Sequence, residues 1–509
     1  MRSTGRWEAW VLALGLGLWM GLLIRGTAKE ARAIPRDLPA LQSELAATLG
    51  STRAPGASWG VQVVSLGSGA VWFETNSTRL FVPASNSKLF SVALALDRFG
   101  TGHVFTTTLR ATTRPDASGR LAGDLWVEGG GDPAPGRGAL ELLALSGFRE
   151  ALTKAGVRSI DGGIRIREGW FDATPYGPGW NWDDLPEAYG APVGALVFAD
   201  NAIRIVVQGG AKPGDPVRVR SEPLDGLFDF VPMARTIPTN RAGRITLQRL
   251  PGSRRMEVRG GLHPGVFHAE RMSVPDGGEW FARALKESLV RSGVEISGGA
   301  GVGDPAADLP PVLASVPSLP LSELAALCLK PSNNLMAHQL WLQVGADLRR
   351  QPRHGDRVNV GDDSERASGA LQKFAEKFGV NADELTMEEG SGLSRKNLVT
   401  PRATVCLLRS MPGRPSGAVF RAALPIGGVD GTLRTRFTEA PLKGNVLAKT
   451  GTLRHVNALG GYLTTAGGQS LAFAIYVNGF QSVDAPGGGR AEIDSLVELL
   501  ARYPGRGPE

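Results

Sequence analysis

The sequence has very little cysteine and little lysine. Two cysteines, Cys328 and Cys406, occur in 509 residues, which is too few for a disulfide-stabilised scaffold. Each stands in an apolar stretch without a C-x-x-C neighbour, so no metal or redox role is indicated. We expect two buried free thiols, and a single disulfide is the alternative. Lysines number 11 among 56 cationic residues, and of these residues only lysine can act as a base near neutral pH.

Several motif classes are absent as well. The six histidines show no H-E-x-x-H or similar spacing, and no Lys/Arg cluster is interleaved with aromatic residues. We therefore expect no metal, no cofactor and no nucleic-acid partner. No repeat of fixed period is evident, and the net charge of +7 favours a soluble basic protein.

One apolar run stands near the N-terminus, from Ala9 to Ile24, after Arg2 and Arg6. It is short for a membrane span and typical of a secretory signal, and no later stretch is long and apolar enough to span a bilayer. Two small-x-small cleavage sites follow, Gly26-Thr27-Ala28 and Ala31-Arg32-Ala33. We expect a signal peptide over residues 1–28, with the second site as the alternative cleavage site, and a periplasmic or otherwise extracytoplasmic protein. An uncleaved membrane anchor is the alternative.

Glycine and proline are abundant, at 68 and 34 residues, which predicts many turns and much β-structure. The length exceeds one ordinary core. Strand-like and helix-like segments occupy both terminal parts, whereas residues 101–310 alternate short strands with turns. This pattern predicts one α/β unit whose first strands pair with its last strands, with a β-rich region inserted between them.

The first chemical motif is an S-x-x-K at the start of a predicted helix, formed by Ser85 and Lys88. Residues i and i+3 share a helix face, so the lysine amine can reach the serine hydroxyl. The positive end of the helix favours negative charge on the serine, and a partly desolvated lysine can serve as its base.

The second motif is an S-x-N between two predicted helices, formed by Ser332 and Asn334. A hydroxyl at this place can relay a proton, and an amide can hold a substrate carbonyl. By itself the motif is equally compatible with a helix cap.

The third motif is Lys449-Thr450-Gly451-Thr452, directly before two strands predicted to pair. A cation and two hydroxyls beside glycine can bind a carboxylate at close backbone approach. Each motif alone is weak, but the order S-x-x-K, S-x-N, K-T-G, with the first on a helix and the last on a strand, is a strong signal.

With these motifs the chain resembles the active-site serine penicillin-recognising enzymes. Ser332 follows Ser85 by 247 positions, and the interval contains GGGDP (129–133) and GWNWDDLPEAYGAPVGALVFADN (179–201). EEGSGLSRKNLVTP (388–401) and LPIGGVDGTLRTRF (424–437) follow. These segments are similar to the D-alanyl-D-alanine carboxypeptidase/endopeptidase family, the class C low-molecular-mass penicillin-binding proteins or peptidase family S13. His338 departs from the family, whose members often carry an acidic residue there, and we expect this to affect local packing.

The resemblance implies an α/β (α+β) fold with a penicillin-recognising serine transpeptidase-like domain, in which an antiparallel sheet is flanked by helices and interrupted by β-rich inserted domains. We expect the split catalytic domain over 34–100 and 311–509, inserted domain II over 101–194 and 263–310, and inserted domain III over 195–262, nested in domain II.

The resemblance also implies the residue roles. Ser85 attacks the D-Ala-D-Ala bond, Lys88 takes its proton, and the backbone N–H groups of Ser85 and Thr452 form the oxyanion hole. Ser332 relays a proton to the leaving amine. Asn334 orients the acyl-donor peptide, while Lys449, Thr450, Gly451 and Thr452 bind the terminal carboxylate. The expected partners are peptidoglycan stem peptides and β-lactam antibiotics.

Four further residues have a functional and a structural interpretation. Leu393 and Arg395 lie where relatives contact the stem peptide, and Trp180 and Asp183 are candidates for its amino-bearing end. An ammonium would suit Asp183 and a carboxylate would suit Arg395. Equally, Asp183 can cap a turn, Arg395 can pair on the surface and Trp180 can belong to a core.

Two other functions remain open at this point. A serine β-lactamase shares the acylation residues, although we find no E-x-x-L-N setting and the insert is long. A non-catalytic peptidoglycan-binding protein is possible on the same fold, although the serines and lysines of all three motifs are intact.

Overall fold

The structure is a computed structural model that describes residues 34–51, 54, 56–134, 145–304, 309–351, 361–481 and 489–507. The expected signal peptide lies outside the described residues. Among the described residues, no helix is both long and apolar enough to cross a bilayer.

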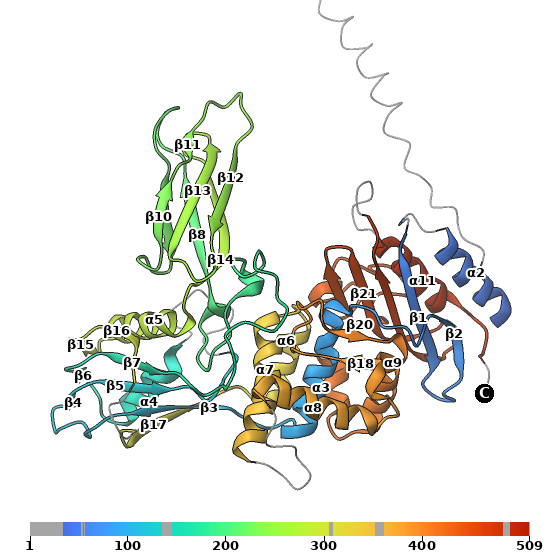
Figure 1. The fold of residues 1–509 in the computed structure, drawn as a ribbon, viewed down its shortest axis with the longest axis horizontal. Coiled ribbons are helices and arrows are strands. Elements are labelled where there is room, and N and C mark those ends of the chain that lie inside the picture. The colour runs from blue at the N-terminus through green and yellow to red at the C-terminus, as the bar shows by residue number, and fades with distance from the viewer. Residues whose placement is uncertain are drawn as a thin grey trace, which may run out of the picture.

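Strands from both ends of the chain form one five-stranded antiparallel sheet in the order β2-β1-β22-β21-β20 (Figure 1). Its strands are β1 (Ser58–Ser65), β2 (Val71–Thr75), β20 (Leu447–Leu453), β21 (Val456–Thr464) and β22 (Ser470–Asn478). β1 and β22 pair in register over eight residues, with Val61 opposite Ile475. The predicted pairing of first and last strands is confirmed.

The sheet is covered on both faces because its strands are apolar on both sides. In β22, Phe473 and Ile475 share a core cluster with the outer helices α2 (Leu38–Gly50) and α11 (Arg490–Arg502). The alternate residues Ala472 and Ala474 belong to the larger cluster on the other face. The helices of that second layer are α3 (Ser87–Phe99), α6 (Leu321–Leu329), α7 (Asn334–Arg350), α8 (Asp363–Glu376), α9 (Pro401–Ser410) and α10 (Gly417–Ala422). A two-stranded ribbon, β18 (Leu385–Thr386) and β19 (Leu398–Val399), lies in the same part of the chain.

Helix α3 is the central element of this layer. Every residue from Ser87 to Leu96 is buried, and the helix ends where Gly100 adopts a positive φ of 83°. Protein therefore surrounds the buried stretch of the helix, which includes Ser87, Lys88 and Ser91 alongside its apolar residues. The start of α3 is therefore held rigidly at the point where the chain enters from the sheet.

The first part of the insert is a mixed five-stranded sheet in the order β16-β7-β5-β3-β17 with a small sheet β15-β6-β4 beside it. Its elements are β3 (Thr106–Arg110), β4 (Arg120–Leu121), β5 (Leu125–Glu128), α4 (Ser146–Lys154), β6 (Ser159–Ile160), β7 (Ile164–Arg167), α5 (Gly277–Arg291), β15 (Glu295–Ile296), β16 (Ala300–Val302) and β17 (Val312–Pro317).

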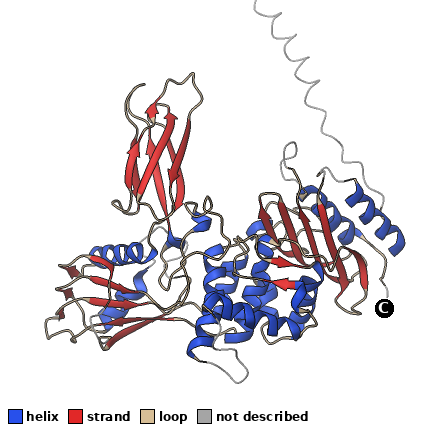
Figure 2. Cartoon of the chain, viewed as in Figure 1, coloured by secondary structure: helices blue, strands red, loops and turns tan. Residues whose placement is uncertain are grey.

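The second part, which we call the distal β-domain (residues 202–273), extends away from the helical layer as a narrow stack of strands (Figure 2). It contains the sheet β14-β8-β9 and the sheet β10-β13-β11, with β12 also paired to β13. The strands are β8 (Ala202–Gln208), β9 (Arg218–Glu222), β10 (Asp229–Pro232), β11 (Arg235–Thr236), β12 (Arg244–Arg249), β13 (Arg255–Leu262) and β14 (Phe267–Ser273). Ile205 of β8 and Val258 of β13 belong to one core cluster, so the two sheets pack face to face.

Two segments pair differently from the boundaries expected from the sequence. Strand β14, placed in domain II by the 262/263 boundary, pairs with β8 over seven residues and belongs to the distal β-domain. Strand β17, placed in the catalytic domain by the 310/311 boundary, pairs with β3 of the inserted sheet. Composition changes mark turn-rich sequence but do not reveal which sheet a strand joins. The division into one split domain and two nested inserts remains a prediction, and we propose it with these two shifts.

Neither cysteine forms a disulfide, as expected, but only Cys328 is buried, whereas Cys406 is half-buried.

Candidate active site

Ser85 lies in a short 3-10 turn (Ala84–Asn86) that leads directly into α3. The preceding Ala84 has a φ of 47°, in the left-handed region that non-glycine residues rarely adopt. Such strain persists only where the surrounding structure enforces it. The turn presents the half-buried Ser85 at the positive end of a helix.

Lys88, one turn into α3, is fully buried beneath Ser85. Its Nζ lies 2.8 Å from Ser85 Oγ, 2.6 Å from Asn334 Oδ1 and 2.5 Å from the carbonyl oxygen of Ser391. Burial lowers the pKa of Lys88 from 10.5 to about 8, against the opposing effects of Cys328 and Glu389. A sizeable neutral fraction near neutral pH makes this amine a suitable base.

A second buried lysine faces a second serine. Lys449 on β20 is fully buried, and its Nζ donates to Ser332 Oγ at 2.8 Å and to the carbonyl oxygen of Thr450 at 2.8 Å. Burial, and then the nearby charge of Lys88, hold the pKa of Lys449 well below its usual range. Ser332 itself has a φ of 63°. Like Ala84 beside Ser85, it adopts the left-handed region that non-glycine residues rarely adopt.

The two asparagines of the second motif have different partners. Asn333 caps α7 by accepting from the N–H of Met336 at 2.9 Å, and its amide donates to Asp200 Oδ1 at 2.9 Å. Asn334 accepts from Lys88 and donates to the carbonyl oxygen of Tyr189 at 3.0 Å. The helix cap is therefore present, but it uses Asn333 and leaves Asn334 in the site.

Strand β20, which carries the third motif, is the last strand of its sheet. A Cβ at Gly451 would lie 2.6 Å from the carbonyl oxygen of Pro83, so only glycine lets the strand approach the Ser85 turn this closely. Thr450 donates its hydroxyl to Thr432 Oγ1 at 2.8 Å, and Thr452 donates to Asn457 Oδ1 at 3.2 Å.

Glu389 is a functional position that the sequence reasoning missed. Its carboxylate is fully buried and accepts from the backbone N–H groups of Ser391 at 2.7 Å and Gly392 at 2.6 Å. This folds the following loop so that the Ser391 carbonyl accepts from Lys88. A Cβ at Gly392 would lie 1.9 Å from the carbonyl oxygen of Ala84. An acidic residue followed by G-S-G-x-S, small residues able to wrap an acceptor, was the available signal.

The three motifs meet at an open cleft of about 830 Å³. Its lining includes the predicted residues Ser85, Asp183, Ser332, Asn334, Leu393, Arg395 and Thr452, together with Asn181, Asp184, Tyr189, Gly392, Leu453 and Arg454. Asp183 is exposed, and Arg395 donates to the carbonyl oxygen of Arg454 at 2.9 Å.

Trp180 is not in the lining of this cleft. Its ring packs against His338, with 5.6 Å between the ring centroids, and against Tyr176. The structural interpretation of Trp180 is therefore the better one. His338 is buried, accepts from the N–H of Gly390 at 3.3 Å, and has a pKa lowered by burial, so its place in the site is one of packing.

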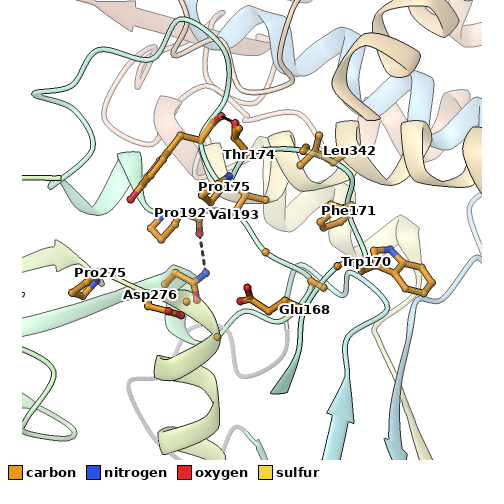
Figure 3. Close-up of a pocket in the computed structure, with 18 of the residues that line it drawn as sticks. Glu168, Trp170, Phe171, Thr174, Pro175, Pro192, Val193, Pro275, Asp276 and Leu342 are labelled. Carbon is orange, nitrogen blue, oxygen red and sulfur yellow. Dashed lines mark hydrogen bonds between the residues drawn. The ribbon is translucent and has the colours of Figure 1, made fainter. Parts of the chain in front are cut away.

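A second cavity of about 400 Å³ lies between α7 and the inserted region (Figure 3). Glu168 and Asp276 lie on one side of it, and Pro192 and Val193 lie across from them. Asp276 caps α5 by accepting from the N–H of Glu279 at 2.8 Å. Neither the two lysines nor the two serines of the motifs line this cavity.

Within the described ranges, no group of three or more His, Cys, Asp or Glu side chains is arranged to hold a metal ion. The site presents the hydroxyl groups of Ser85, Ser332 and Thr452 at the cleft and the buried amines of Lys88 and Lys449 beneath it.

Comparison with known proteins shows the family of the chain and its fold. The model of the D-Ala-D-Ala carboxypeptidase 3 (S13) family matches residues 41–503. The chain is 32% identical over 496 residues to a D-alanyl-D-alanine carboxypeptidase of Actinomadura sp., covering 95% of this chain and 88% of that protein. It is 26% identical over 413 residues to D-alanyl-D-alanine carboxypeptidase DacB of Haemophilus influenzae, covering 80% and 83%.

Among solved structures, penicillin binding protein 4 (dacB) of Haemophilus influenzae superposes with a TM-score of 0.75 at 24% identity, covering 91% of this chain and 99% of that one. This similarity shows that the two chains share the fold.

Proposed function

This chain belongs to the D-Ala-D-Ala carboxypeptidase 3 (S13) family and is a serine-type D-Ala-D-Ala carboxypeptidase; on that premise we propose that Ser85 is its nucleophile and Lys88 the base that activates it. The observation that carries this proposal is the 2.8 Å separation of Lys88 Nζ and Ser85 Oγ at a site where burial lowers the lysine pKa to about 8.

In the acylation step, neutral Lys88 takes the proton of Ser85 as Oγ attacks the carbonyl carbon of the penultimate D-alanine. Negative charge develops on the carbonyl oxygen. The backbone N–H groups of Ser85 and Thr452 stabilise it, and both residues line the cleft.

The tetrahedral intermediate then collapses with cleavage of the C–N bond. The leaving amine of the terminal D-alanine needs a proton, and Ser332 Oγ supplies it, with Lys449 at 2.8 Å able to restore the proton to that hydroxyl. The product is an ester of Ser85. Water then attacks the ester, the departing Ser85 Oγ takes back the proton held by Lys88, and the proton lost by the water passes to solvent, which regenerates the serine and the neutral amine.

Thr450, Thr452 and Lys449, which flank Gly451, bind the substrate carboxylate. Lys449 gains a proton readily when a carboxylate enters, because an adjacent negative charge favours the ammonium form. The carboxylate of a β-lactam takes the same place, and Ser85 is the residue that β-lactams acylate. Asn334 orients the acyl-donor peptide.

The rest of the stem peptide lies along Leu393, with Asp183 and Arg395 contacting its charged groups. Both charged residues line the cleft, whereas Trp180 has no place in this proposal. The substrates are peptidoglycan stem peptides, and the enzyme reaches them by export through its N-terminal segment.

The test is intact-mass spectrometry of the purified protein after brief incubation with benzylpenicillin, together with release of D-alanine from a D-Ala-D-Ala peptide. We expect one lasting adduct, located by fragmentation on Ser85 and not on the neighbouring Ser87 or Ser91. Ser85→Ala should lose both the adduct and D-alanine release. D-alanine release that survives in pure Ser85→Ala protein would overturn the nucleophile. Rapid loss of the drug without an adduct would favour a β-lactamase.

A further inference from the structure

Positive charge is concentrated in the distal β-domain. Residues 202–273 contain 12 lysines and arginines and 6 aspartates and glutamates, a net charge of +6, while the whole chain has +7. Eleven of the twelve cations are arginines. One seventh of the chain thus carries nearly all of its net charge. An even distribution of charged residues along the chain would not give this excess.

The first basic face is the outer surface of the sheet β14-β8-β9. Ile203, Ile205 and Val207 of β8 are buried in the core, so the alternate residues face outward. The register places Arg204 opposite both Arg271 and Glu222. The outward charged residues of the three strands are Arg204, Arg218, Arg220, Arg271 and Glu222, a net charge of +3.

The second basic face is the outer surface of the other sheet. Met256 and Val258 of β13 are buried, so Arg255, Glu257 and Arg259 face outward. The pairings of β10, β11 and β12 with β13 add further outward charges. The outward charged residues are Asp229, Arg235, Arg244, Arg255, Glu257 and Arg259, a net charge of +2.

These arginines remain open to solvent although several form ion pairs. The side chains of Arg220, Arg255 and Arg259 are 50%, 62% and 51% exposed. Arg255 and Arg259 share one carboxylate, Glu257. Exposed ion pairs of this kind contribute little to stability, so the charge excess is not explained by folding.

The positive charge is carried by regularly spaced guanidinium groups, which indicates a phosphate-bearing polymer as the partner. Guanidinium groups bind phosphate through two parallel hydrogen bonds. Outward residues two apart on a strand, such as Arg218 and Arg220, stand about 7 Å apart, a spacing that a chain of phosphodiesters can follow. The basic residues lie on opposite faces of the domain. A flat partner surface can therefore contact only one of these faces at a time, whereas a flexible polymer can contact both.

We propose that the distal β-domain binds a linear polyanion of the cell envelope with phosphodiester repeats. The domain projects away from the helical layer (Figure 1), and the described residues that line the cleft all lie outside residues 202–273, so the polymer would not block the cleft. Holding the enzyme on such a polymer would raise its local concentration near peptidoglycan. This inference concerns attachment and does not depend on which residues cleave the substrate.

The experiment measures binding of the full-length protein to an immobilised poly(glycerol phosphate) oligomer across a salt series. Affinity should fall steeply between about 50 and 200 mM salt, as expected when counterions are released from a polyanion. Replacing two contacts with Arg218→Gln and Arg220→Gln should weaken binding about tenfold and reduce the slope of log affinity against log salt by roughly 1.4.

The second face is tested by Arg255→Gln with Arg259→Gln, for which we expect a loss of the same size. The matched control is Arg120→Gln with Arg291→Gln, which removes the same charge from the insert at side chains 61% and 62% exposed that also pair with carboxylates. The control should bind within about twofold of the wild type with an unchanged slope.

Three outcomes would overturn the proposal. The first is binding to poly(glycerol phosphate) that does not depend on salt or is absent. The second is a control variant that weakens binding as much as the distal variants, because net charge alone would then explain it. The third is preferential, arginine-dependent binding to vesicles of phosphatidylcholine with phosphatidylglycerol, which would identify a membrane as the occupant. Insertion of the N-terminal apolar segment into vesicles would not change with the arginine variants.

Discussion

The catalytic cleft and the distal β-domain use positive charge in opposite ways. In the cleft, Lys88 and Lys449 are fully buried and their pKa values are lowered by that burial. In the distal β-domain eleven of the twelve cations are arginines, and the side chains of Arg220 and Arg259 are about half exposed. Lysine serves where a proton must move, and arginine serves where charge must be permanent.

The surroundings differ in the same sense. Lys88 is held by neutral oxygen atoms of Ser85, Asn334 and Ser391, none of which neutralises a charge. Arg255 and Arg259 instead share the carboxylate of Glu257. A buried amine among neutral acceptors gives up its proton more easily, whereas a solvated guanidinium beside a carboxylate keeps it. The comparison predicts effects of very different size in the two regions.

The largest effect is expected at Lys88. Lys88→Met removes the proposed base, and Lys88→Arg keeps a cation that cannot deprotonate. Both variants should acylate with benzylpenicillin about 10³–10⁴-fold more slowly than the wild type, measured by stopped-flow or mass spectrometry. If Lys88→Arg kept most of the acylation rate, a positive charge at this position would be sufficient for acylation and a base would not be needed. The proposed difference between the cleft lysines and the distal arginines would then be wrong.

A smaller effect is expected at Glu389, which holds the loop over Lys88. Glu389→Gln places an amide NH₂ against backbone N–H donors and should lower the free energy of unfolding by about 3 kcal/mol, measured by chemical denaturation. The matched control is Glu388→Gln at the adjacent, 41% exposed residue that pairs with Lys396. It should change stability by no more than about 0.5 kcal/mol. Equal losses in the two variants would contradict the role of Glu389.

The next effect is a pH dependence of stability. The folded pKa of Lys88 is about 8 and its ordinary value is 10.5, so between these values the unfolded chain binds more protons and stability rises with pH. From about pH 8.5 to about pH 10 the wild type should gain about 2 kcal/mol relative to Lys88→Met. Denaturation curves of the two proteins at each pH give this difference. Parallel pH dependences would show that Lys88 titrates as an ordinary lysine.

The smallest effect is expected in the distal β-domain. Arg218→Gln with Arg220→Gln should change the free energy of unfolding by less than about 0.5 kcal/mol and leave D-alanine release from a small peptide unchanged. Thermal unfolding and a steady-state assay check this. A large loss of stability or of small-peptide activity would mean that these arginines belong to the folded core or to the site, and not to a separate surface.

Much of the fold was predictable because it rests on local patterns. The apolar strands over 58–75 and near the C-terminus, and the helix that follows Ser85, were expected from their hydrophobic periodicity and turn residues. The pairing of the first strands with the last, seen at β1 and β22, followed from assigning both terminal parts to one α/β unit. The exact boundaries of the inserts did not follow, since β14 and β17 look like any other short strand and their partners are distant in sequence.

The site was predictable at its three motifs and not between them. The motif spacing identifies Ser85, Lys88 and Ser332 in the sequence. Glu389 cannot be told from a surface carboxylate in the sequence, because only the folded loop brings backbone N–H groups to its side chain. Trp180 shows the converse case. Its neighbourhood in the sequence is similar to that of substrate-binding residues in the family, but the ring turns toward His338, and side-chain direction within a loop is not encoded in a sequence pattern.

The measurement that tests the account most directly is the pH dependence of the acylation rate constant of the wild-type protein with benzylpenicillin, from about pH 6 to about pH 10. If burial makes Lys88 the base for Ser85, the rate constant should rise with pH to a plateau, with a midpoint near the Lys88 pKa of about 8. A rate constant that stays flat across this range, or that rises only near the ordinary lysine value of 10.5, would contradict the account.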